Sequence, residues 1–336
     1  FEEKKRRHEI VIPTELTVGM WLDRWMEEVV RPNRARSTIY GYENMIRNHI
    51  RPALGDTVLQ ELSPEQIQSY YLQMRQEGLG SNTVHKHHQL LFTALECAVR
   101  HEMLNRNPAR RVDPPAKEPP RHAFYNTEQL RTLFLVVRGE PLEPAVKLAG
   151  YLGLRRSEIC GLKWEHVDFK HGTVSICQAR TTIGGVTINK GPKTSSSVRT
   201  LGISGLSDLE DILRSMWEEQ HRRRLADPRF NPDGFVLVHA DGQPYAPDYV
   251  SGWFTRFVRA HGLPYLTLHG LRHSFASAAN ELHIPLFKIS KALGHSNTSV
   301  TSQVYTHLFD DTQSEVLSQV ASAIEYGRKE EQMSLF

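Results

Sequence analysis

The stretch Gly153-Leu154-Arg155-Arg156-Ser157-Glu158 leads into Leu162-Lys163-Trp164. Farther along the chain stands His269-Gly270-Leu271-Arg272-His273, and Leu293-Gly294-His295 is followed, ten residues after its histidine, by Tyr305. These three signatures bring arginines, histidines and a tyrosine into one half of a chain of 336 residues.

The two arginines of these signatures suit the binding of a phosphodiester. Its transition state spreads negative charge over the equatorial oxygens, and a guanidinium group can donate to two oxygens at once while staying protonated. Arg155 and Arg272 fit that task. Gly153 permits a close approach of the backbone, and Glu158 can orient Arg155; a plain surface ion pair between Arg155 and Glu158 is the alternative.

Tyr305 is the candidate nucleophile, and an ordinary core or surface aromatic is the alternative for this residue. A phenol ordinarily has a pKa near 10, so it needs a neighbour that takes its proton. His269 is the candidate base, and His295 is the candidate hydrogen-bond donor to a non-bridging phosphate oxygen. The pattern predicts strand transfer through a phosphotyrosine link, which keeps the energy of the broken bond and calls for no ATP, metal or other cofactor.

In their order and spacing, the three signatures closely resemble the tyrosine recombinase family, the phage-type integrases. The resemblance extends over about residues 15 to 320 and is strongest from residue 150 onward. In that family a lysine on the turn of a β-hairpin, in a Pro-Lys-Thr stretch followed by an arginine, protonates the leaving 5′ oxygen. The resemblance assigns this role to Lys193, with Arg199 as the following arginine and Lys190 as a rival for the role.

Helical patterns fill residues 16–107. Ser63-Pro64-Glu65-Gln66 supplies an N-cap, a proline in the first turn and a capping-box glutamine. Apolar residues at helical spacing on both sides of it predict four helices. Three histidines, His85, His87 and His88, fall in the fourth helix, where they face either DNA or, as the simpler interpretation, solvent.

Five prolines lie between residues 108 and 120. Because proline fixes φ and removes a hydrogen-bond donor, this stretch predicts an extended linker. A second unit begins at another capping box, Asn126-Thr127-Glu128-Gln129, and continues with strand-like runs and a Gly184-Gly185 hairpin turn. It is expected to be α+β and mostly helical.

The sequence therefore predicts a mainly α protein with a small antiparallel β-sheet. A helical core-binding domain is joined to an α+β catalytic domain of tyrosine-recombinase type, and by the resemblance the two close on DNA as a C-shaped clamp. The expected segments are a basic linker remnant (1–13), a helical core-site DNA-binding domain (14–107), a proline-rich basic linker (108–122), the catalytic domain (123–310) and a C-terminal tail helix (311–336).

The resemblance implies double-stranded DNA as the partner, bound at core recombination sites by a protein that is a monomer alone and a homotetramer at a Holliday junction. It also implies integration or excision of a mobile element, with accessory DNA-bending or directionality proteins. Basic residues near the linker and the hairpin would contact phosphates without reading the base sequence. The expected DNA contacts are Arg110, Arg111, Lys117, Arg121, Lys190 and Arg199.

Both ends of the chain leave alternatives open. The tail carries an apolar stripe at helical spacing, which docks either on a neighbouring protomer or on the core of its own chain. The charged start up to Glu9 resembles the end of a linker to a small amino-terminal domain that binds arm sites, and a simpler recombinase without that domain is the alternative. The stripe consists of Val316, Leu317, Val320, Ala321 and Ile324.

The composition argues against several other classes. The net charge of +3 is too small to identify a nucleic-acid binder by itself. No apolar run approaches the roughly 18 residues of a membrane span. The three cysteines are widely spaced and form no C-x-x-C pair, which argues against a disulfide framework and suits the cytoplasm. His269 and His273 have the spacing of zinc ligands, but Gly270 stands where a metalloprotease needs glutamate.

Two alternatives to recombination remain at this point. A catalytically silent DNA-binding protein would keep the same fold, although all six residues of the strand-transfer chemistry are present. A type IB topoisomerase-like enzyme would use that chemistry to relax supercoils as a monomer. The helical first domain and the separate tail favour recombination.

Overall fold

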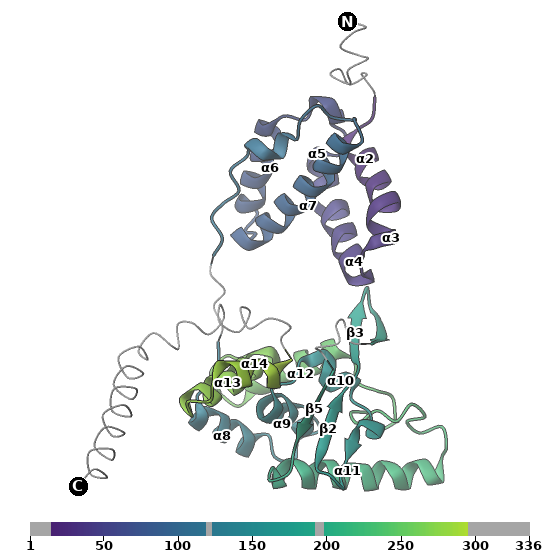
Figure 1. The fold of residues 1–336 in the computed structure, drawn as a ribbon, viewed down its shortest axis with the longest axis vertical. Helices are drawn as coiled ribbons and strands as arrows, with labels where there is room; N and C mark the ends of the chain where they lie inside the picture. Colours follow the sequence, from purple (N-terminus) through teal and green to yellow (C-terminus); the bar gives the residue numbers. More distant parts are fainter. Residues whose placement is uncertain (1–14, 119–122, 192–197, 295–336) are drawn as a thin grey trace, which may run out of the picture. The chain divides into compact units, whose positions relative to one another are not determined.

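The structure is a computed structural model that describes residues 15–118, 123–191 and 198–294. It divides into two compact units, unit 1 (Phe1–Pro120) and unit 2 (Arg121–Phe336), shown in Figure 1. Each unit contains a hydrophobic core of its own. The predicted class is confirmed, because the described chain is mostly helical with small antiparallel sheets. No helix in the described ranges is long and apolar enough to cross a membrane.

Unit 1 begins with two long helical segments, each of which contains a π-helical turn just before a proline, Pro32 or Pro52. Proline lacks an N–H, and its ring crowds the carbonyl four residues back. The wider π turn accommodates the proline while the helix continues. The segments are α2 (Val18–Trp25), η1 (Met26–Val30) and α3 (Arg31–Asn33), then α4 (Arg36–Met45), η2 (Ile46–Ile50) and α5 (Arg51–Leu54).

A short 3-10 helix, η3 (Leu59–Glu61), precedes the last two helices of unit 1, α6 (Pro64–Gln76) and α7 (Ser81–Arg100). α6 begins at the predicted capping box, in which the backbone N–H of Gln66 donates to the Ser63 hydroxyl at 3.3 Å and the Gln66 side chain accepts from the Ser63 N–H at 2.9 Å. After α7, the 3-10 helix η4 (Pro108–Arg111) packs against both α6 and α7. The packed part of unit 1 thus includes residues 108–111, which were expected to belong to the linker.

Two tyrosine–histidine pairs join α6 to α7. The Tyr70 hydroxyl and His87 Nδ1 are 2.7 Å apart, and the Tyr71 hydroxyl and His88 Nδ1 are 3.0 Å apart. His87 is only 2% exposed, so the predicted solvated face is wrong for this residue. Burial, with a smaller contribution from the neighbouring His49, lowers the pKa of His87 to about 4.

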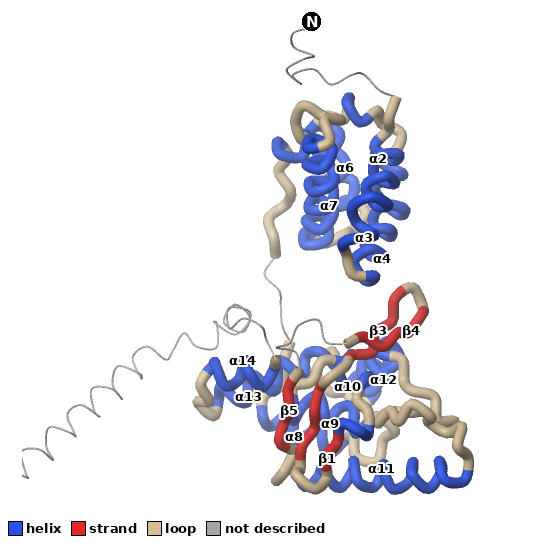
Figure 2. Tube along the Cα trace, turned by 45° about the vertical axis from the view of Figure 1, so that its right-hand side comes forward, coloured by secondary structure: helices blue, strands red, loops and turns tan. Residues whose placement is uncertain are grey.

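Unit 2 combines helices with two separate antiparallel sheets. The strands β1, β2 and β5 stand side by side in one sheet, and β3 and β4 form a two-stranded hairpin, as Figure 2 shows. The predicted single sheet is therefore corrected to two. β2 pairs directly with β5, as Ile176 does with Arg199, and the hairpin that lies between these strands in the sequence forms a sheet of its own. The strands are β1 (Val167–Asp168), β2 (Thr173–Ile176), β3 (Ala179–Ile183), β4 (Val186–Lys190) and β5 (Arg199–Gly202).

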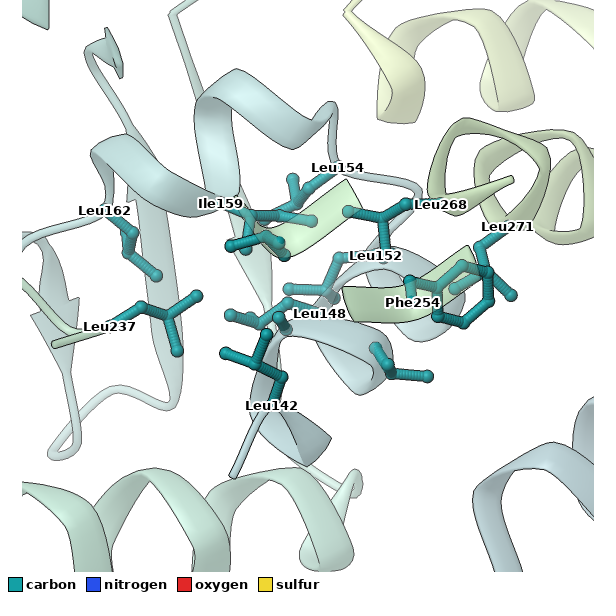
Figure 3. Packing of buried hydrophobic residues seen from close by; sticks show 14 of the residues in the cluster. Leu142, Leu148, Leu152, Leu154, Ile159, Leu162, Leu237, Phe254, Leu268 and Leu271 are labelled. Atoms are coloured by element: carbon teal, nitrogen blue, oxygen red, sulfur yellow. The ribbon is translucent and has the colours of Figure 1, made fainter. Parts of the chain in front are cut away.

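The helix α9 (Glu143–Leu152) occupies the centre of unit 2. Figure 3 shows Leu148 and Leu152 of α9 in one cluster with Ile159, Phe254 and Leu271. Because neighbouring helices cover it on several sides, nearly every residue of α9 is buried. Around it lie α8 (Thr127–Val136), α10 (Arg156–Gly161), η5 (Trp164–His166), α11 (Ser207–Ala226), α12 (Pro247–Ala260), α13 (Leu268–Glu281) and α14 (Leu286–Leu293).

We expect unit 1 to lose stability as the pH falls from about 6.5 to about 4. Below the ordinary pKa of 6.5, the unfolded chain binds a proton that folded His87, with its pKa lowered to about 4, does not bind. The free energy of unfolding should therefore fall by about 3 kcal/mol as the pH passes through this window and then level off. Hydrogen exchange of the α7 amides at pH 7.5 and pH 4, corrected for the pH dependence of intrinsic exchange, measures the change.

The matched control for this experiment is His87→Gln, which can still accept from Tyr70 and does not titrate. Its α7 amides should show a shallower pH dependence than those of the wild-type chain. Equal slopes in the two proteins would assign the effect to other groups.

Candidate active site

The backbone around Arg155 is fixed by two local features. α9 ends at Gly153, whose φ of 62° is left-handed, and Arg155 is the N-cap of α10. A Cβ on Gly153 would lie 2.6 Å from Cδ2 of Leu293, so glycine is required both by the conformation and by the close approach of α14. The arginine therefore sits at a sharp turn between two packed helices.

A single carboxylate organises this turn. Glu158, in the first turn of α10, is 6% exposed. It accepts from the backbone N–H of Arg155 at 2.8 Å and from Arg155 Nη1 at 2.7 Å. Arg199 donates to the same carboxylate, from Nη1 at 3.2 Å and from Nη2 at 2.9 Å. The expected contact between Arg155 and Glu158 is thus present, and Arg199 is a second partner that the sequence did not indicate.

The charge of Glu158 follows from these contacts. Burial by itself raises the pKa of the carboxyl group, but the hydrogen bonds and charge of Arg199, followed by those of Arg155, hold its pKa below the ordinary value. Glu158 is therefore an anion at neutral pH. One negative charge is shared between two guanidinium groups.

Arg272 lies in α13 and is 2% exposed. Its Nη1 donates to the Gly153 carbonyl and its Nη2 to the Leu293 carbonyl, both at 2.8 Å. The side chain therefore ties the turn before Arg155 to the end of α14. Arg155 itself is 34% exposed, and its Nη2 lies 3.5 Å from the Gly294 carbonyl.

These contacts form one cluster at the carboxyl end of α14, where Arg199 Nε also donates to the Ala292 carbonyl at 2.9 Å. Three consecutive carbonyls, those of residues 292–294, thus accept from three arginines. A helix leaves its last carbonyls without partners and carries partial negative charge at this end, which favours cations. We call Arg155, Arg199 and Arg272 the arginine cluster.

His269 lies one helical turn before Arg272 on α13 and is exposed. Its ring stands edge-on to that of His273, with centroids 5.0 Å apart. Residues three apart on a helix lie on neighbouring parts of its surface. His269 and Arg272 therefore belong to the same region of unit 2.

Among the candidate catalytic and DNA-contact residues, Lys193, His295, Tyr305 and Arg121 fall outside the described ranges, and so does the apolar stripe of the tail. Gly294, whose carbonyl faces Arg155, directly precedes His295 in the sequence. Lys190, the rival of Lys193, is the last residue of β4 and is half-buried. Within the described parts of the chain, no three histidine, cysteine or acidic side chains are placed to hold a metal ion.

The expected DNA contacts lie in different surroundings. Arg111 and Lys117 are exposed. Arg110 forms a two-pronged ion pair with Glu96, with Nε to Oε1 at 2.7 Å and Nη2 to Oε2 at 2.9 Å. The side chain of Arg199 is only 8% exposed, within the arginine cluster.

The chain matches two protein families in succession. Residues 17–74 match the family described as "Phage integrase, N-terminal SAM-like domain", and residues 126–312 match the "Phage integrase family". A tyrosine recombinase XerC-like protein of Caldanaerobacter subterraneus subsp. tengcongensis is 29% identical over 314 residues, which cover 88% of this chain and 80% of that protein. The ICEBs1 integrase of Bacillus subtilis is 22% identical over 320 residues, covering 94% and 84%.

Solved structures share the fold. The Tn1549 transposon integrase in complex with transposon right end DNA has a TM-score of 0.78 and 20% identity, and the match covers 91% of this chain and 99% of that one. A lambda integrase tetramer bound to a Holliday junction has a TM-score of 0.65 and 19% identity, covering 88% and 81%.

Replacing Arg272 with lysine should destabilise unit 2, because one ammonium group cannot span both the Gly153 and Leu293 carbonyls. We expect the free energy of unfolding to fall by about 2 kcal/mol, the cost of leaving a buried carbonyl without a partner. Hydrogen exchange of the α13 amides measures it. The matched control is Arg156→Lys, a half-exposed pair with Asp248, with an expected change within about 0.5 kcal/mol. Similar losses in the two variants would contradict the anchoring role of Arg272.

Proposed function

The chain belongs to the phage integrase family, and from this membership we propose how its own residues carry out strand transfer. The protein is a site-specific DNA recombinase that acts in the integration or excision of a mobile element. We infer the roles of individual residues from the contacts of the arginine cluster, and the assembly from the likeness to DNA-bound integrases.

The observation that carries the proposal is the arginine cluster at the end of α14. Arg155 and Arg272, from separate elements, both donate to carbonyls immediately before His295. Arg155 is one-third exposed and makes only a 3.5 Å contact with Gly294, so its guanidinium can exchange that carbonyl for a phosphate oxygen. Arg272 is buried and held by two carbonyls, so it supplies positive charge in a fixed position. Together they bind the scissile phosphate and stabilise the charge that develops on its oxygens.

The remaining roles follow the chemistry of the bond. The Tyr305 oxygen attacks the phosphorus atom, forms a 3′-phosphotyrosyl bond and displaces the 5′ oxygen. His269 accepts the phenolic proton, His295 donates to a non-bridging oxygen, and Lys193 protonates the leaving 5′ oxygen. A 5′ hydroxyl of the partner strand then attacks the phosphotyrosine and releases the tyrosine. Because the energy of the broken bond is kept, strand exchange requires no ATP.

We place this reaction on double-stranded DNA, at core sites brought together by four protomers through a Holliday junction. The support is the likeness to the lambda integrase tetramer bound to a Holliday junction and to the Tn1549 integrase in complex with transposon DNA. Arg111 and Lys117 contact phosphates, while Arg110 must first leave Glu96. The reaction belongs in the cytoplasm of a bacterium, since the similar proteins named above are bacterial, and DNA-bending or directionality proteins assist it.

The nucleophile can be tested by trapping. The wild-type protein and Tyr305→Phe are each mixed with a random-sequence pool of nicked DNA duplexes, in chelator and without ATP. Cleavage next to the nick releases a short DNA fragment, and loss of this fragment prevents religation. We expect a detergent-stable protein–DNA adduct with the wild-type protein only. Sequencing the trapped DNA then gives the cleavage site.

Each contrary outcome of the trapping experiment has a distinct meaning. An adduct with Tyr305→Phe assigns the nucleophile to another residue. No adduct from the wild-type protein, with or without chelator and despite clear DNA binding, favours a catalytically silent DNA-binding protein. An adduct that forms in a parallel reaction with magnesium and is lost in chelator would show that the reaction requires a metal.

The general acid can be tested with a modified leaving group. Lys193→Ala should cleave the trapped site about 100-fold more slowly, because the 5′ oxygen leaves without a proton. Replacing that oxygen with sulfur should restore the rate, since a thiolate leaves without protonation. Lys190→Ala, the variant of the rival residue, should cleave both substrates at nearly the wild-type rate when the protein is saturating, so that a weaker DNA contact does not affect the rate. The opposite pattern would assign the role to Lys190.

A further inference from the structure

Arg199 occupies an unusual position for a residue expected to contact DNA. It is the first residue of β5, and its side chain is 8% exposed. The guanidinium reaches both oxygens of Glu158 and the Ala292 carbonyl. Gly294 leaves room for it, because a Cβ at this position would lie 2.8 Å from Arg199 Nη1. The side chain is therefore packed against the end of α14, and little of its surface is accessible to a phosphate.

The contacts of Arg199 also change what Arg155 can do. If Glu158 had Arg155 as its only cationic partner, the carboxylate would neutralise that guanidinium at close range in a partly buried place. Arg199 donates to the same two oxygens, so two positive charges share one negative charge. The pair of arginines keeps a net charge of +1, on the side where Arg155 reaches the surface.

Arg199 also connects elements that would otherwise move independently. Through Glu158 it holds α10, through Ala292 it holds the end of α14, and its own backbone belongs to the sheet of β1, β2 and β5. Arg199 follows Lys193 by six residues in the sequence. A displacement of Arg199 would shift Arg155 and the carbonyl end of α14 together.

We propose that Arg199 is a positioning residue for strand cleavage, which shares Glu158 with Arg155 and so leaves the charge of Arg155 available to the scissile phosphate, without contacting DNA itself. The inference rests on the proposed function, in which Arg155 binds that phosphate. It replaces the expectation from the sequence that Arg199 contacts DNA directly.

The test separates DNA affinity from cleavage. Wild-type protein, Arg199→Gln and Arg199→Lys are compared on the nicked duplex recovered by trapping, with the Kd measured at several salt concentrations and the cleavage rate measured at saturating protein in a single turnover. For Arg199→Gln we expect a Kd within about twofold of wild type and a cleavage rate about 10- to 100-fold lower, as for loss of a side chain that orients a reacting group. Arg199→Lys, which keeps the charge, should recover part of the rate.

The matched control is Arg222→Gln on α11. Arg222 is also paired with a glutamate, Glu219, at 2.7 Å, but its side chain is 73% exposed. This variant should bind and cleave like the wild-type protein. Thermal unfolding of all variants identifies any that fail to fold, and if Arg199→Gln is among them, Arg199→Lys and Glu158→Gln carry the test.

A double variant tests the charge argument. If Arg199 acts by offsetting the charge of Glu158, then Arg199→Gln should cost less in a chain that already carries Glu158→Gln. The double variant should therefore cleave faster than the product of the two single effects predicts. A purely structural role in holding α14 gives effects that multiply, and this result would overturn the proposal.

Two further results would also count against it. A weaker Kd for Arg199→Gln, with a salt dependence reduced by about one phosphate contact, would make Arg199 a direct DNA contact. Unchanged cleavage in Arg199→Gln would remove any role in the reaction. Failure of the wild-type protein itself to cleave would instead refute the proposed function, so the two failures are distinguishable.

Discussion

The carbonyl groups of residues 292–294 accept hydrogen bonds from Arg155, Arg199 and Arg272, and the arrangement of unit 2 around the site depends on these contacts. The arginines come from the start of α10, the start of β5 and the first half of α13. A helix end that would otherwise leave carbonyls without partners thus joins three elements that are far apart in the sequence. The left-handed glycines Gly153 and Gly294 permit the close approach, because a Cβ on either would collide with the opposite side chain.

The central position of α9 explains why these contacts are stable. It is buried on nearly all sides and packs against α13, so the turn at Gly153 and the helix that carries Arg272 are held by one core. Even its lysine, Lys147, is fully buried and is paired with Glu143 and Asp208 at 2.5 and 2.6 Å. Positions on a rigid core are held more accurately than positions on loops, and the proposed binding of a phosphate would require that accuracy.

Local features of this fold could be predicted from the sequence, and contacts between distant residues could not. The capping boxes at Ser63 and Asn126 appear where they were expected, because four consecutive residues contain all the information for such a contact. The ion pair between Arg155 and Glu158 is similarly local. The burial of His87 depends on Tyr70 in another helix. The strands β2 and β5 pair although the whole hairpin of β3 and β4 separates them in the sequence. The contact of Arg199 with Glu158 spans 41 residues and has no local signature.

The same contacts concentrate positive charge in one place, although the net charge of the chain is only +3. Three guanidinium groups and one carboxylate leave a net charge of +2 in the arginine cluster, next to a helix end. Positive charge at a surface with few counter-charges attracts a phosphate more strongly than the same charge spread over exposed ion pairs, which water and salt screen. Arg222 and Arg223 of α11 are of the latter kind, because both are paired with Glu219. The distribution of charge, rather than its sum, therefore marks the proposed site, and the burial of Arg199 and Arg272 leaves Arg155 as the most exposed member of the cluster.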